Sequence, residues 1–354
     1  MEISRRGFIS AAGAAVAVGG PSSSAAEDTA RGGARTPTGQ PATVTFLAFA
    51  DIHYCPGVFP HDTREWLERV LDRAVSRKVD FVIHAGDFVH NPVKDMDYVK
   101  LYNDFSIPTY HTLGNHDTEG CTLAETLAAY RMERGHYHFD RNGFRFVVLD
   151  TNYFRDDGGR FVHFEGGNYR KVPSSRSWTC SEEEYAWAEE TLKTSPFPCV
   201  VFMHQSCERE RGGMPDWRRM RDLFGWVNRK HGNKVRLVVN GHHHTDGLRF
   251  IDGIPYLDLN SANYKYYAES HRLYPAAYRK AHIGAGHVIA WEDPISAVIT
   301  LDAEGRLTIE GQKSAFFMGI SPEKAKFPQR DRPVTPNIQS IDLRLCLRKT
   351  RRNA

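Results

Sequence analysis

Gly114-Asn115-His116-Asp117 is the stretch around which the rest of this chain is organised. It follows a strand-like apolar run and places a potential metal ligand, Asn115, beside a potential proton donor, His116. Four further segments have the same character: Asp51-Ile52-His53, Gly86-Asp87, His204 and Gly241-His242-His243-His244. The carboxyl ends of neighbouring parallel strands open into one crevice, where residues distant in the sequence can meet. These five segments therefore predict one shared site.

The hydrophobic pattern around these segments predicts the fold class. The apolar runs that precede them cover residues 44–50, 81–85, 108–113, 200–203 and 235–240. Helix-like patterns lie at residues 63–77, 95–103, 122–134, 181–194 and 216–231. Strands that alternate with helices of this length are typical of an α/β fold with a largely parallel central sheet. Further strand-like runs at 143–150, 248–251, 254–259, 297–301 and 307–310 indicate a second sheet.

The N-terminal residues carry the features of an export signal. Ser4-Arg5-Arg6-Gly7-Phe8-Ile9 leads into a weakly apolar stretch, residues 10–20, and Ser24-Ala25-Ala26 has the small residues of a cleavage site. The paired arginines resemble a twin-arginine (Tat) signal, the bacterial route for proteins that have already folded. We therefore expect a signal peptide at residues 1–26, a linker at 27–40, contact with the twin-arginine export machinery, and a periplasmic or secreted protein.

The rest of the chain is expected to form one domain, residues 41–320, because a boundary anywhere between residues 51 and 244 would separate the site segments. No later apolar run approaches the roughly 18 residues that span a bilayer, so we expect no membrane segment in the mature protein. The six cysteines form no Cys-x-x-Cys pair, so a zinc knuckle is not indicated.

Charge is distributed unevenly along the chain. The whole chain carries a net charge of +3, of which residues 1–26 contribute +1 and residues 321–354 contribute +6. The remaining residues therefore carry −4, and a mildly acidic body gives no reason to expect a nucleic acid as partner. Residues 321–354 are expected to form a basic, solvated C-terminal tail.

The five segments supply side chains suited to divalent metals: Asp51, His53, Asp87, Asn115, His204, His242 and His244. Carboxylate and amide oxygens and imidazole nitrogens bind such ions, and one carboxylate can bridge two of them. Two clusters that share an aspartate would hold two metals about 3.5–4 Å apart, which clamps a phosphoryl group and generates hydroxide at neutral pH. Manganese, iron, zinc and cobalt all accept such ligands, so the identity of the metal stays open.

Asp-x-His, Gly-Asp, Gly-Asn-His-Asp, a lone His and Gly-His-x-His, in this order, resemble the calcineurin-like metallophosphoesterase superfamily. The resemblance implies a four-layer α/β/β/α sandwich, with two central mixed sheets and a binuclear metal centre at the strand ends. It assigns the first metal to Asp51, His53, Asp87 and His244. It assigns the second metal to Asp87, which bridges, and to Asn115, His204 and His242.

The resemblance also implies a reaction, in which a metal-bound hydroxide attacks phosphorus in line. His116 would protonate the leaving oxygen, and Asp117 would orient His116 and help to keep it charged. His90 stands where purple acid phosphatases carry a tyrosine, and Asn91 where protein serine/threonine phosphatases carry an arginine, so both subfamilies are disfavoured. The expected activity is the hydrolysis of a small phosphoester, with a phosphodiester favoured and a phosphomonoester as the alternative.

A non-catalytic metal-binding scaffold of the same fold is the competing hypothesis, and the presence of all seven ligands and of His116 argues against it. Histidines outside the motifs need no catalytic role: His84 and His111 are expected to be core residues, and His243 to fill space between two ligands. Substrate choice is expected to depend on the long segments 152–178, 208–217 and 263–280, which are rich in aromatic and basic residues.

Overall fold

The computed structural model describes residues 42–58, 61, 63–210, 212–267, 273–327 and 332–347. The expected signal peptide and linker, residues 1–40, lie outside the described residues, as do residues 348–354 of the expected tail. The described residues all belong to one compact unit, Gly32–Ala354.

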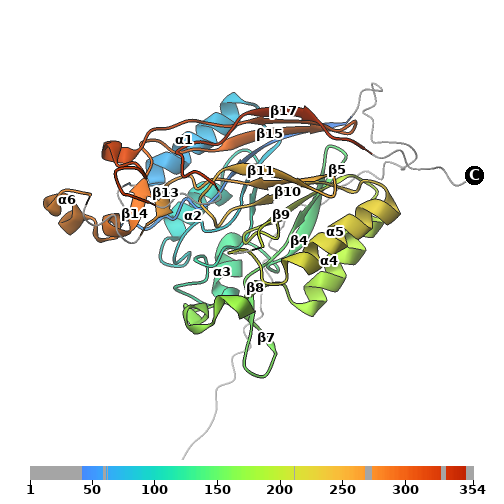
Figure 1. The fold of residues 1–354 in the computed structure, drawn as a ribbon, viewed down its shortest axis with the longest axis horizontal. Coiled ribbons are helices and arrows are strands. Elements are labelled where there is room, and N and C mark those ends of the chain that lie inside the picture. Colours follow the sequence, from blue (N-terminus) through green and yellow to red (C-terminus); the bar gives the residue numbers. More distant parts are fainter. Residues whose placement is uncertain are drawn as a thin grey trace, which may run out of the picture. The chain divides into compact units, whose positions relative to one another are not determined.

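Two six-stranded sheets form the centre of the fold (Figure 1). The strands of the first sheet are β1 (Thr43–Phe49), β2 (Phe81–His84), β3 (Thr109–His111), β15 (Ala297–Asp302), β16 (Arg306–Glu310) and β17 (Ile341–Arg344). Those of the second are β4 (Tyr137–Arg141), β5 (Phe144–Val148), β9 (Cys199–Met203), β10 (Val235–Asn240), β11 (Gly247–Ile251) and β12 (Ile254–Asp258). The strand orders are β17-β16-β15-β1-β2-β3 and β11-β12-β10-β9-β5-β4.

Each sheet has a parallel part, to which antiparallel strands are added at one edge of the first sheet and at both edges of the second. β1, β2 and β3 run parallel, as do β5, β9, β10 and β12. β15 pairs antiparallel with β1, so the runs near residues 297–310 extend the first sheet rather than the second. Parallel strands end on the same side of a sheet, which brings the loops after β1, β2 and β3 together and likewise those after β9 and β10.

The space between the sheets is filled by side chains that alternate along the strands. Phe46 of β1 meets Phe146 of β5 and Phe202 of β9 edge to face, with ring centroids 5.5 and 5.9 Å apart. Phe49, three residues further along β1, points to the other side of the first sheet, where it packs on Tyr102 of a covering helix. The strand period of two therefore assigns one set of apolar residues to each face.

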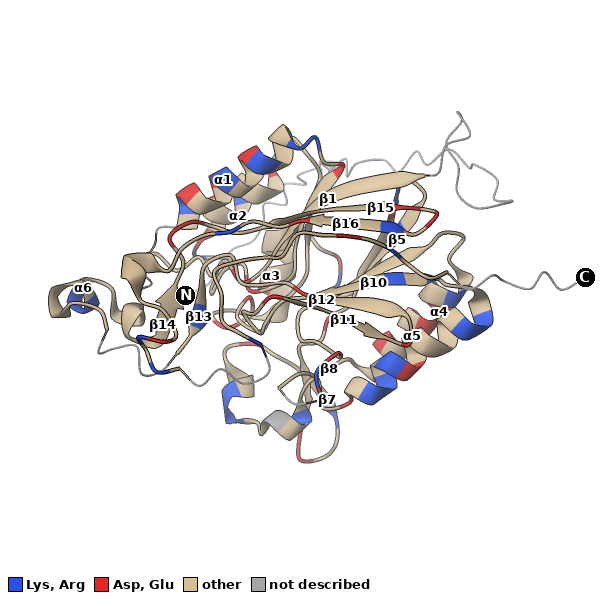
Figure 2. Cartoon of the chain, turned by 45° about the horizontal axis from the view of Figure 1, so that its top comes forward, with Lys and Arg blue, Asp and Glu red and all other residues tan. Residues whose placement is uncertain are grey.

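Helices cover the outer face of each sheet. α1 (Thr63–Ser76), α2 (Met96–Asn103) and α3 (Leu123–Tyr130) pack in the same core as the first sheet, and α4 (Glu182–Thr194) and α5 (Trp217–His231) cover the second. Leu192 of α4 and Phe224 of α5 share a second core with Val147, Val201 and Val238 of the strands. Charged residues mark α1, α4 and α5 while the strands are mostly uncharged (Figure 2). The expected four-layer α/β/β/α sandwich with two mixed sheets is confirmed.

The helices follow the local signals of the sequence. α1 buries Trp66, Leu67, Val70, Leu71 and Ala74, the spacing of one apolar stripe on a helix. α3 begins at a capping box, in which the Thr122 side chain accepts from the Glu125 backbone N–H and the Glu125 carboxylate accepts from the Thr122 N–H.

The long segments that we expected to set substrate choice contain structure of their own. Residues 152–178 hold β6 (Tyr153–Arg155), β7 (Phe161–His163), most of β8 (Ser177–Thr179) and a 3-10 helix, Asn168–Lys171. These strands form a three-stranded antiparallel sheet in the order β7-β6-β8. In the third segment, β13 (Tyr264–Tyr266) pairs with β14 (Val288–Ala290), and α6 (Ala276–Ala281) follows β13 along the chain.

The described part of the expected solvated tail, residues 321–327 and 332–347, packs on the body of the fold. β17 pairs with β16 and completes the first sheet. Arg332, whose side chain is 9% exposed, forms ion pairs with the buried carboxylates of Asp258 and Glu208. Ala325, Val334, Ile338 and Leu345 of the segment are buried apolar side chains. The basic residue Arg332 therefore neutralises buried acids instead of meeting solvent.

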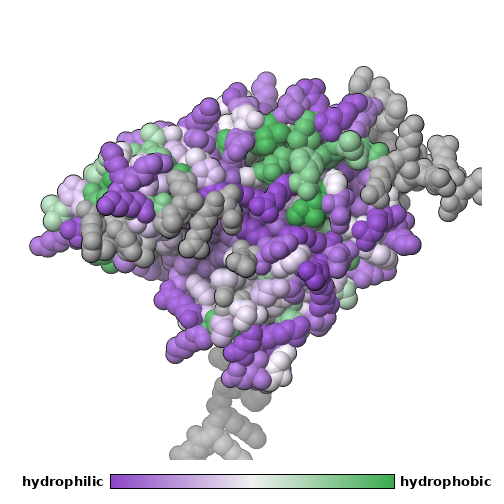
Figure 3. All heavy atoms as spheres, viewed as in Figure 1, coloured by the Kyte–Doolittle hydropathy of each residue, from purple (hydrophilic) through white to green (hydrophobic). Residues whose placement is uncertain are grey.

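The face seen in Figure 1 is mostly hydrophilic, with an apolar area where β17, β15 and β11 lie (Figure 3). Phe250 of β11 is 53% exposed. Within the described ranges, no helix combines the length and the apolar composition needed to cross a membrane.

Candidate metal centre

The five sequence segments meet at the carboxyl ends of the strands. Asp51 and His53 follow β1, Asp87 follows β2, Asn115 and His116 follow β3, His204 follows β9, and His242 and His244 follow β10. The structure gathers six of the seven predicted ligands into two groups whose ligand atoms lie within 4.8 Å of one another: Asp51, His53 and His244, and Asp87, His204 and His242. The seventh, Asn115, is 5% exposed and directly precedes His116, whose backbone N–H donates to Asp87 Oδ1 at 2.8 Å.

The separations between ligand atoms match those around bound ions. In the first group, His244 Nε2 lies 3.2 Å from Asp51 Oδ1 and 3.3 Å from His53 Nε2. Ligands on a tetrahedral ion with bonds of 2.0–2.1 Å are roughly 3.3 Å apart. Asp87 Oδ2 lies 3.0 Å from His204 Nε2 and 3.8 Å from His53 Nε2, so this carboxylate stands between the two groups, where a bridging ligand would be.

Five of the predicted ligands have left-handed backbone conformations, which β-carbon sterics disfavour. Their φ angles lie between 48° and 69°, at Asp51, His53, Asp87, His242 and His244. Backbone hydrogen bonds hold the first loop in this shape, because the Asp51 N–H donates to Gly86 O at 3.0 Å and the His53 N–H to Asp87 O at 3.1 Å. Backbone strain of this kind is concentrated at functional sites, where the surroundings enforce it.

Two motif glycines are required by close packing behind the ligands. A β-carbon on Gly86, whose φ is 94°, would lie 2.2 Å from His204 Nδ1. One on Gly114 would lie 2.2 Å from Asp87 Oδ1. The glycines of the Gly-Asp and Gly-Asn-His-Asp segments therefore let the loops after β2, β3 and β9 approach one another.

The hydrogen bonds of two histidines leave their Nε2 atoms ready to bind a cation. His204 Nδ1 donates to the carbonyl of Ala85 at 2.7 Å, and His244 Nδ1 donates to the carbonyl of Tyr264. Because a carbonyl can only accept, each Nδ1 carries a hydrogen, and in the neutral ring each Nε2 keeps a lone pair. His204 Nε2 is buried without a hydrogen-bond partner. A second nitrogen held by a backbone carbonyl is the usual arrangement of a metal-binding histidine, so the residues present fit the metals that the resemblance implies.

The electrostatics of the centre favour a cation as well. Burial alone would raise the pKa of Asp87, but the neighbouring His204 and His116 hold it well below its usual value. Burial alone would lower the pKa of His204, but the charges of Asp87 and Asp51 raise it to about 9. Buried carboxylates that stay ionised draw positive charge to this point, from protons on histidine or from a metal ion.

His116 lies at the edge of the ligand groups. Its ring centroid is 5.0 Å from that of His53, and its side chain is 18% exposed. Nδ1 donates to Glu119 Oε2 at 2.9 Å. Burial alone would lower the pKa of His116, but Asp87 and Glu119 raise it. The two carboxylates therefore favour the protonated form of His116, which is the form that a proton donor needs.

Asp117 does not make the contact that we expected. Its buried carboxylate accepts backbone N–H groups of Asp87, Phe88, Val89 and Gly114 at 2.7–3.2 Å, and the Tyr130 hydroxyl at 2.5 Å. The group that orients the His116 ring is Glu119. The correction has a steric reason: consecutive residues of a turn point in different directions, so Asp117 faces the backbone behind the site.

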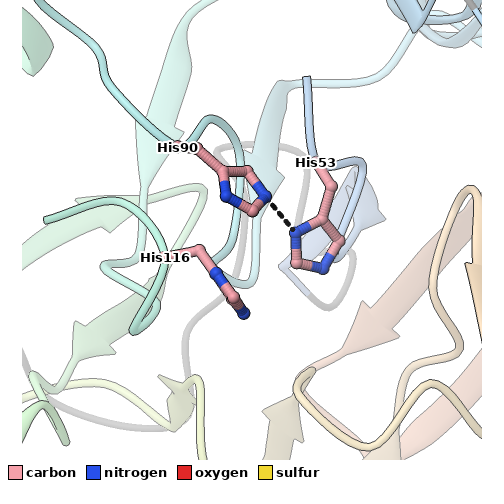
Figure 4. A group of neighbouring side chains, drawn as sticks. All are labelled: His53, His90 and His116. Carbon is pink, nitrogen blue, oxygen red and sulfur yellow. Dashed lines mark hydrogen bonds between the residues drawn. The ribbon is translucent and has the colours of Figure 1, made fainter. Parts of the chain in front are cut away.

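Several residues around the centre were missed from the sequence. His53, His90 and His116 form a third group of imidazoles, which converge from three loops (Figure 4). His90 had been noted only because it replaces a tyrosine. Further side chains in contact with the centre include Glu119, Tyr169, Trp178, Gln205 and Tyr266. Of these, Glu119 had a local signal, because it lies three residues after His116 in the same turn.

The histidines behind the site are core residues, as expected. The Gly86 N–H donates to His84 Nδ1 at 3.2 Å, so His84 Nε2 must carry the hydrogen that His111 Nδ1 accepts at 2.7 Å. His111 Nε2 then donates to Asn103 Oδ1 at 2.6 Å. Burial lowers the pKa of both histidines, in keeping with two neutral rings.

Aromatic rings from two of the long segments border the centre. Trp178, at the end of segment 152–178, has its ring centroid 5.1 Å from that of His242. Tyr266, in segment 263–280, lies 5.3 Å from His244 and 6.2 Å from His116. These segments therefore reach the side of the centre on which a substrate would bind.

Two mixed sheets between layers of helices, with two groups of aspartate and histidine at the strand ends, define the class of metal-dependent phosphoester hydrolases. The sequence profile of the calcineurin-like phosphoesterase family matches residues 44–246, and the chain belongs to that family. The enzyme class expected from the sequence is confirmed.

The chain is similar to several solved structures. A dimetal phosphatase from Danio rerio is 16% identical, with a TM-score of 0.53, and the match covers 77% of this chain and 96% of that one. A putative 5'-nucleotidase from Staphylococcus aureus is 14% identical, with a TM-score of 0.43, over 82% of this chain and 56% of that one. At such identities the likeness concerns the fold alone. No curated protein sequence matches this chain.

Proposed function

We propose that this protein is an exported phosphodiesterase that works with two divalent metal ions. The observation that carries the proposal is the pairing of two ligand groups across Asp87, with His116 beside them. The first ion would be held by Asp51, His53, Asp87 and His244, and the second by Asp87, Asn115, His204 and His242.

The chain's own residues have separate tasks in the reaction. The bound metals supply Lewis acidity and a nucleophile at neutral pH. Asp87 lies between the two ligand groups and would bind both ions, and its Oδ1 also accepts the backbone N–H of His116. With Nδ1 donating to Glu119, His116 offers its Nε2 hydrogen to the leaving oxygen, which a poor leaving group needs before it can depart.

The charges near the centre favour a diester, which carries one negative charge, over a monoester dianion. Among the described residues of the long segments, Arg170 and Lys265 approach the centre, and both are occupied. Arg170 pairs with Glu119, and Lys265 Nζ donates to the carbonyl of His243 at 2.6 Å. A phosphomonoesterase is the alternative, and Arg170 is the observation that favours it, because its side chain is 63% exposed and could turn to a second phosphate charge.

The test is hydrolysis of bis-nitrophenyl phosphate beside nitrophenyl phosphate, by protein that has been stripped of metal and reloaded with manganese, zinc or iron. We expect a higher kcat/KM for the diester with at least one metal, and loss of activity after chelation. A preference for the monoester would make the enzyme a phosphatase. Absence of turnover with every metal, although two ions are bound, would revive the scaffold hypothesis.

The role of His116 has its own test. His116→Ala should lower turnover much more for a diester with an alkoxide leaving group than for one with nitrophenolate, because nitrophenolate needs little protonation. General acids of this kind contribute roughly 10²–10⁴-fold, which sets the scale of the difference. Equal losses on both substrates would remove His116 from this role.

We also propose export through the twin-arginine pathway, on the basis of Arg5 and Arg6 and the stretch that follows them. In a bacterial host with this pathway, the protein should appear outside the cytoplasm. Replacement of both arginines by lysine should retain it in the cytoplasm, while the same change at Arg218 and Arg229, two exposed arginines of the surface helix α5, should not. Export that persists without the two arginines would contradict the proposal.

A further inference from the structure

The carboxylate of Glu119 accepts hydrogen bonds from four residues, and its side chain is 10% exposed. Oε2 accepts from His90 Nδ1 and from His116 Nδ1, both at 2.9 Å. Oε1 accepts from the Tyr169 hydroxyl at 3.1 Å and from the guanidinium of Arg170. Burial alone would raise the pKa of Glu119, but His116 and His90 hold it far below the usual range, so the carboxylate stays ionised.

On one side, these hydrogen bonds lead to the first metal. An ionised carboxylate can only accept, so His90 Nδ1 carries a hydrogen and its Nε2, in the neutral ring, accepts. His90 Nε2 lies 3.2 Å from His53 Nδ1, so His53 Nδ1 must donate (Figure 4). His53 Nε2 is then left with a lone pair, and this is the atom that faces Asp51, Asp87 and His244.

On the other side, they lead to the second metal. The Tyr169 hydroxyl donates to Glu119, so it can accept from Asn115 Nδ2, which lies 3.3 Å away. Gln205 Nε2 donates to Asn115 Oδ1 at 3.2 Å, so both contacts fix the orientation of the amide, and the second lone pair of Oδ1 is available for a metal. Tyr169 and Arg170 lie in the 3-10 helix Asn168–Lys171 of segment 152–178, so this segment is joined to the catalytic turn through Glu119.

We propose that Glu119 is a positioning residue that couples His116 to both metals, through His90 and His53 on one side and through Tyr169 and Asn115 on the other. The proposal rests on the acid role of His116 in the proposed function. Glu119 touches no reacting atom. It acts by holding the Nδ1 hydrogen of His116, so that Nε2 is the nitrogen that faces the leaving group. Partners of metal ligands in such positions typically contribute 10–100-fold to metal affinity or activity.

The first measurement does not depend on activity or on metal. Histidine tautomers can be observed in long-range ¹H–¹⁵N spectra of metal-free protein labelled in its 17 histidines. The signals of His90 and His116 are assigned from the variants His90→Gln and His116→Gln. At a pH high enough for both rings to be neutral, both should be Nδ1–H tautomers in the unaltered protein, and in Glu119→Ala both should exchange between tautomers. The matched control is Glu183→Ala, at an exposed glutamate in the first turn of α4.

The second measurement separates positioning from general damage to the fold. In Glu119→Ala, the ratio of kcat/KM for an alkoxide leaving group to that for nitrophenolate should fall roughly 10-fold or more, part of the loss in His116→Ala. The Kd of both metals, titrated in chelator buffers, should rise about 10–100-fold. Tyr169→Phe keeps the ring and removes only the hydroxyl, so it should weaken the second metal alone and leave the two histidine tautomers unchanged.

Four results would overturn the proposal. One is a ratio of kcat/KM for the two leaving groups that is the same in Glu119→Ala as in the unaltered enzyme, although His116→Ala changes it. This result would leave the proposed function intact. Another is unchanged tautomers of His90 and His116 in Glu119→Ala, or a third metal ion bound at His53, His90 and His116. A ratio that stays unchanged in His116→Ala itself would overturn the acid role in the proposed function, and the coupling with it.

Discussion

Replacement of Asp117 by asparagine removes one of two oxygens that organise the loops behind the metal centre. Oδ2 accepts the backbone N–H groups of Asp87 and Gly114 at 2.9 and 2.7 Å. Oδ1 accepts those of Phe88 and Val89 and the hydroxyl of Tyr130. Asparagine keeps the same shape, but its amide nitrogen cannot accept from a donor. Whichever way the amide turns, at least two buried backbone N–H groups lose their acceptor.

The size of the effect follows from this count. A buried donor left without a partner costs about 1–3 kcal/mol, so Asp117→Asn should lower the free energy of unfolding by about 2–6 kcal/mol. For a domain of this length, 1 kcal/mol corresponds to roughly 2 °C in Tm, which makes the expected decrease about 4–12 °C. The loops affected carry Asp87 and the turn of His116, so metal affinity should fall as well.

Calorimetry of the metal-free proteins measures this change without the stabilisation that bound metal adds. Asp97→Asn is the matched control, because Asp97 is exposed in the first turn of α2, and its loss should stay within about 0.5 kcal/mol. A decrease in Tm of less than about 2 °C for Asp117→Asn would refute the assignment of Asp117 as a structural acceptor. It would return the residue to the neighbourhood of His116.

Three further changes test other parts of the structure. Asp87→Asn should lower the metal content below two ions per chain together with activity, and a fully loaded, active variant would rule out the bridging role. In urea unfolding, Arg332→Ala should lower the free energy of unfolding by about 3 kcal/mol, the low end for breaking a buried ion pair. The loss is at the low end because Arg209 still faces the same two carboxylates, Asp258 and Glu208. A loss below about 1 kcal/mol would show that these ion pairs do not hold the C-terminal segment. Burial alone would lower the pKa of His163, but Asp150 raises it above its usual value. The ion pair of His163 and Asp150 therefore stabilises the fold fully below about pH 6.5, the pKa of a free histidine. This contribution is lost as the pH rises through the pKa of His163 in the folded protein. The difference in Tm between the protein and His163→Gln should accordingly shrink between pH 6 and roughly pH 8, and a constant difference would contradict it.

The positions of the ligands were predictable because two simple regularities act together. Apolar runs of strand length precede Asp51, Asp87, Asn115, His204 and His242, and parallel strands deliver their ends to one edge. Neither regularity needs knowledge of contacts between distant loops. The fold class followed for the same reason, since the alternation of strand and helix periods is local.

The environment of His116 was not predictable in this way. Glu119 lies 29 residues from His90 and 50 from Tyr169, and these contacts arise only when three loops and an inserted segment have packed together. The role of Asp117 was misjudged because adjacency in sequence does not say which way a turn points a side chain. The C-terminal segment was misjudged because its basic composition suggested solvent, whereas Arg332 finds its partners 74 and 124 residues away.

The most direct test of the metal centre is anomalous diffraction from crystals of the protein reconstituted with manganese. Two peaks roughly 3.5–4 Å apart are expected, on the two sides of Asp87. The first should be bound by Asp51, His53 and His244, and the second by Asn115, His204 and His242. A single peak, or a peak among His53, His90 and His116, would contradict the binuclear assignment.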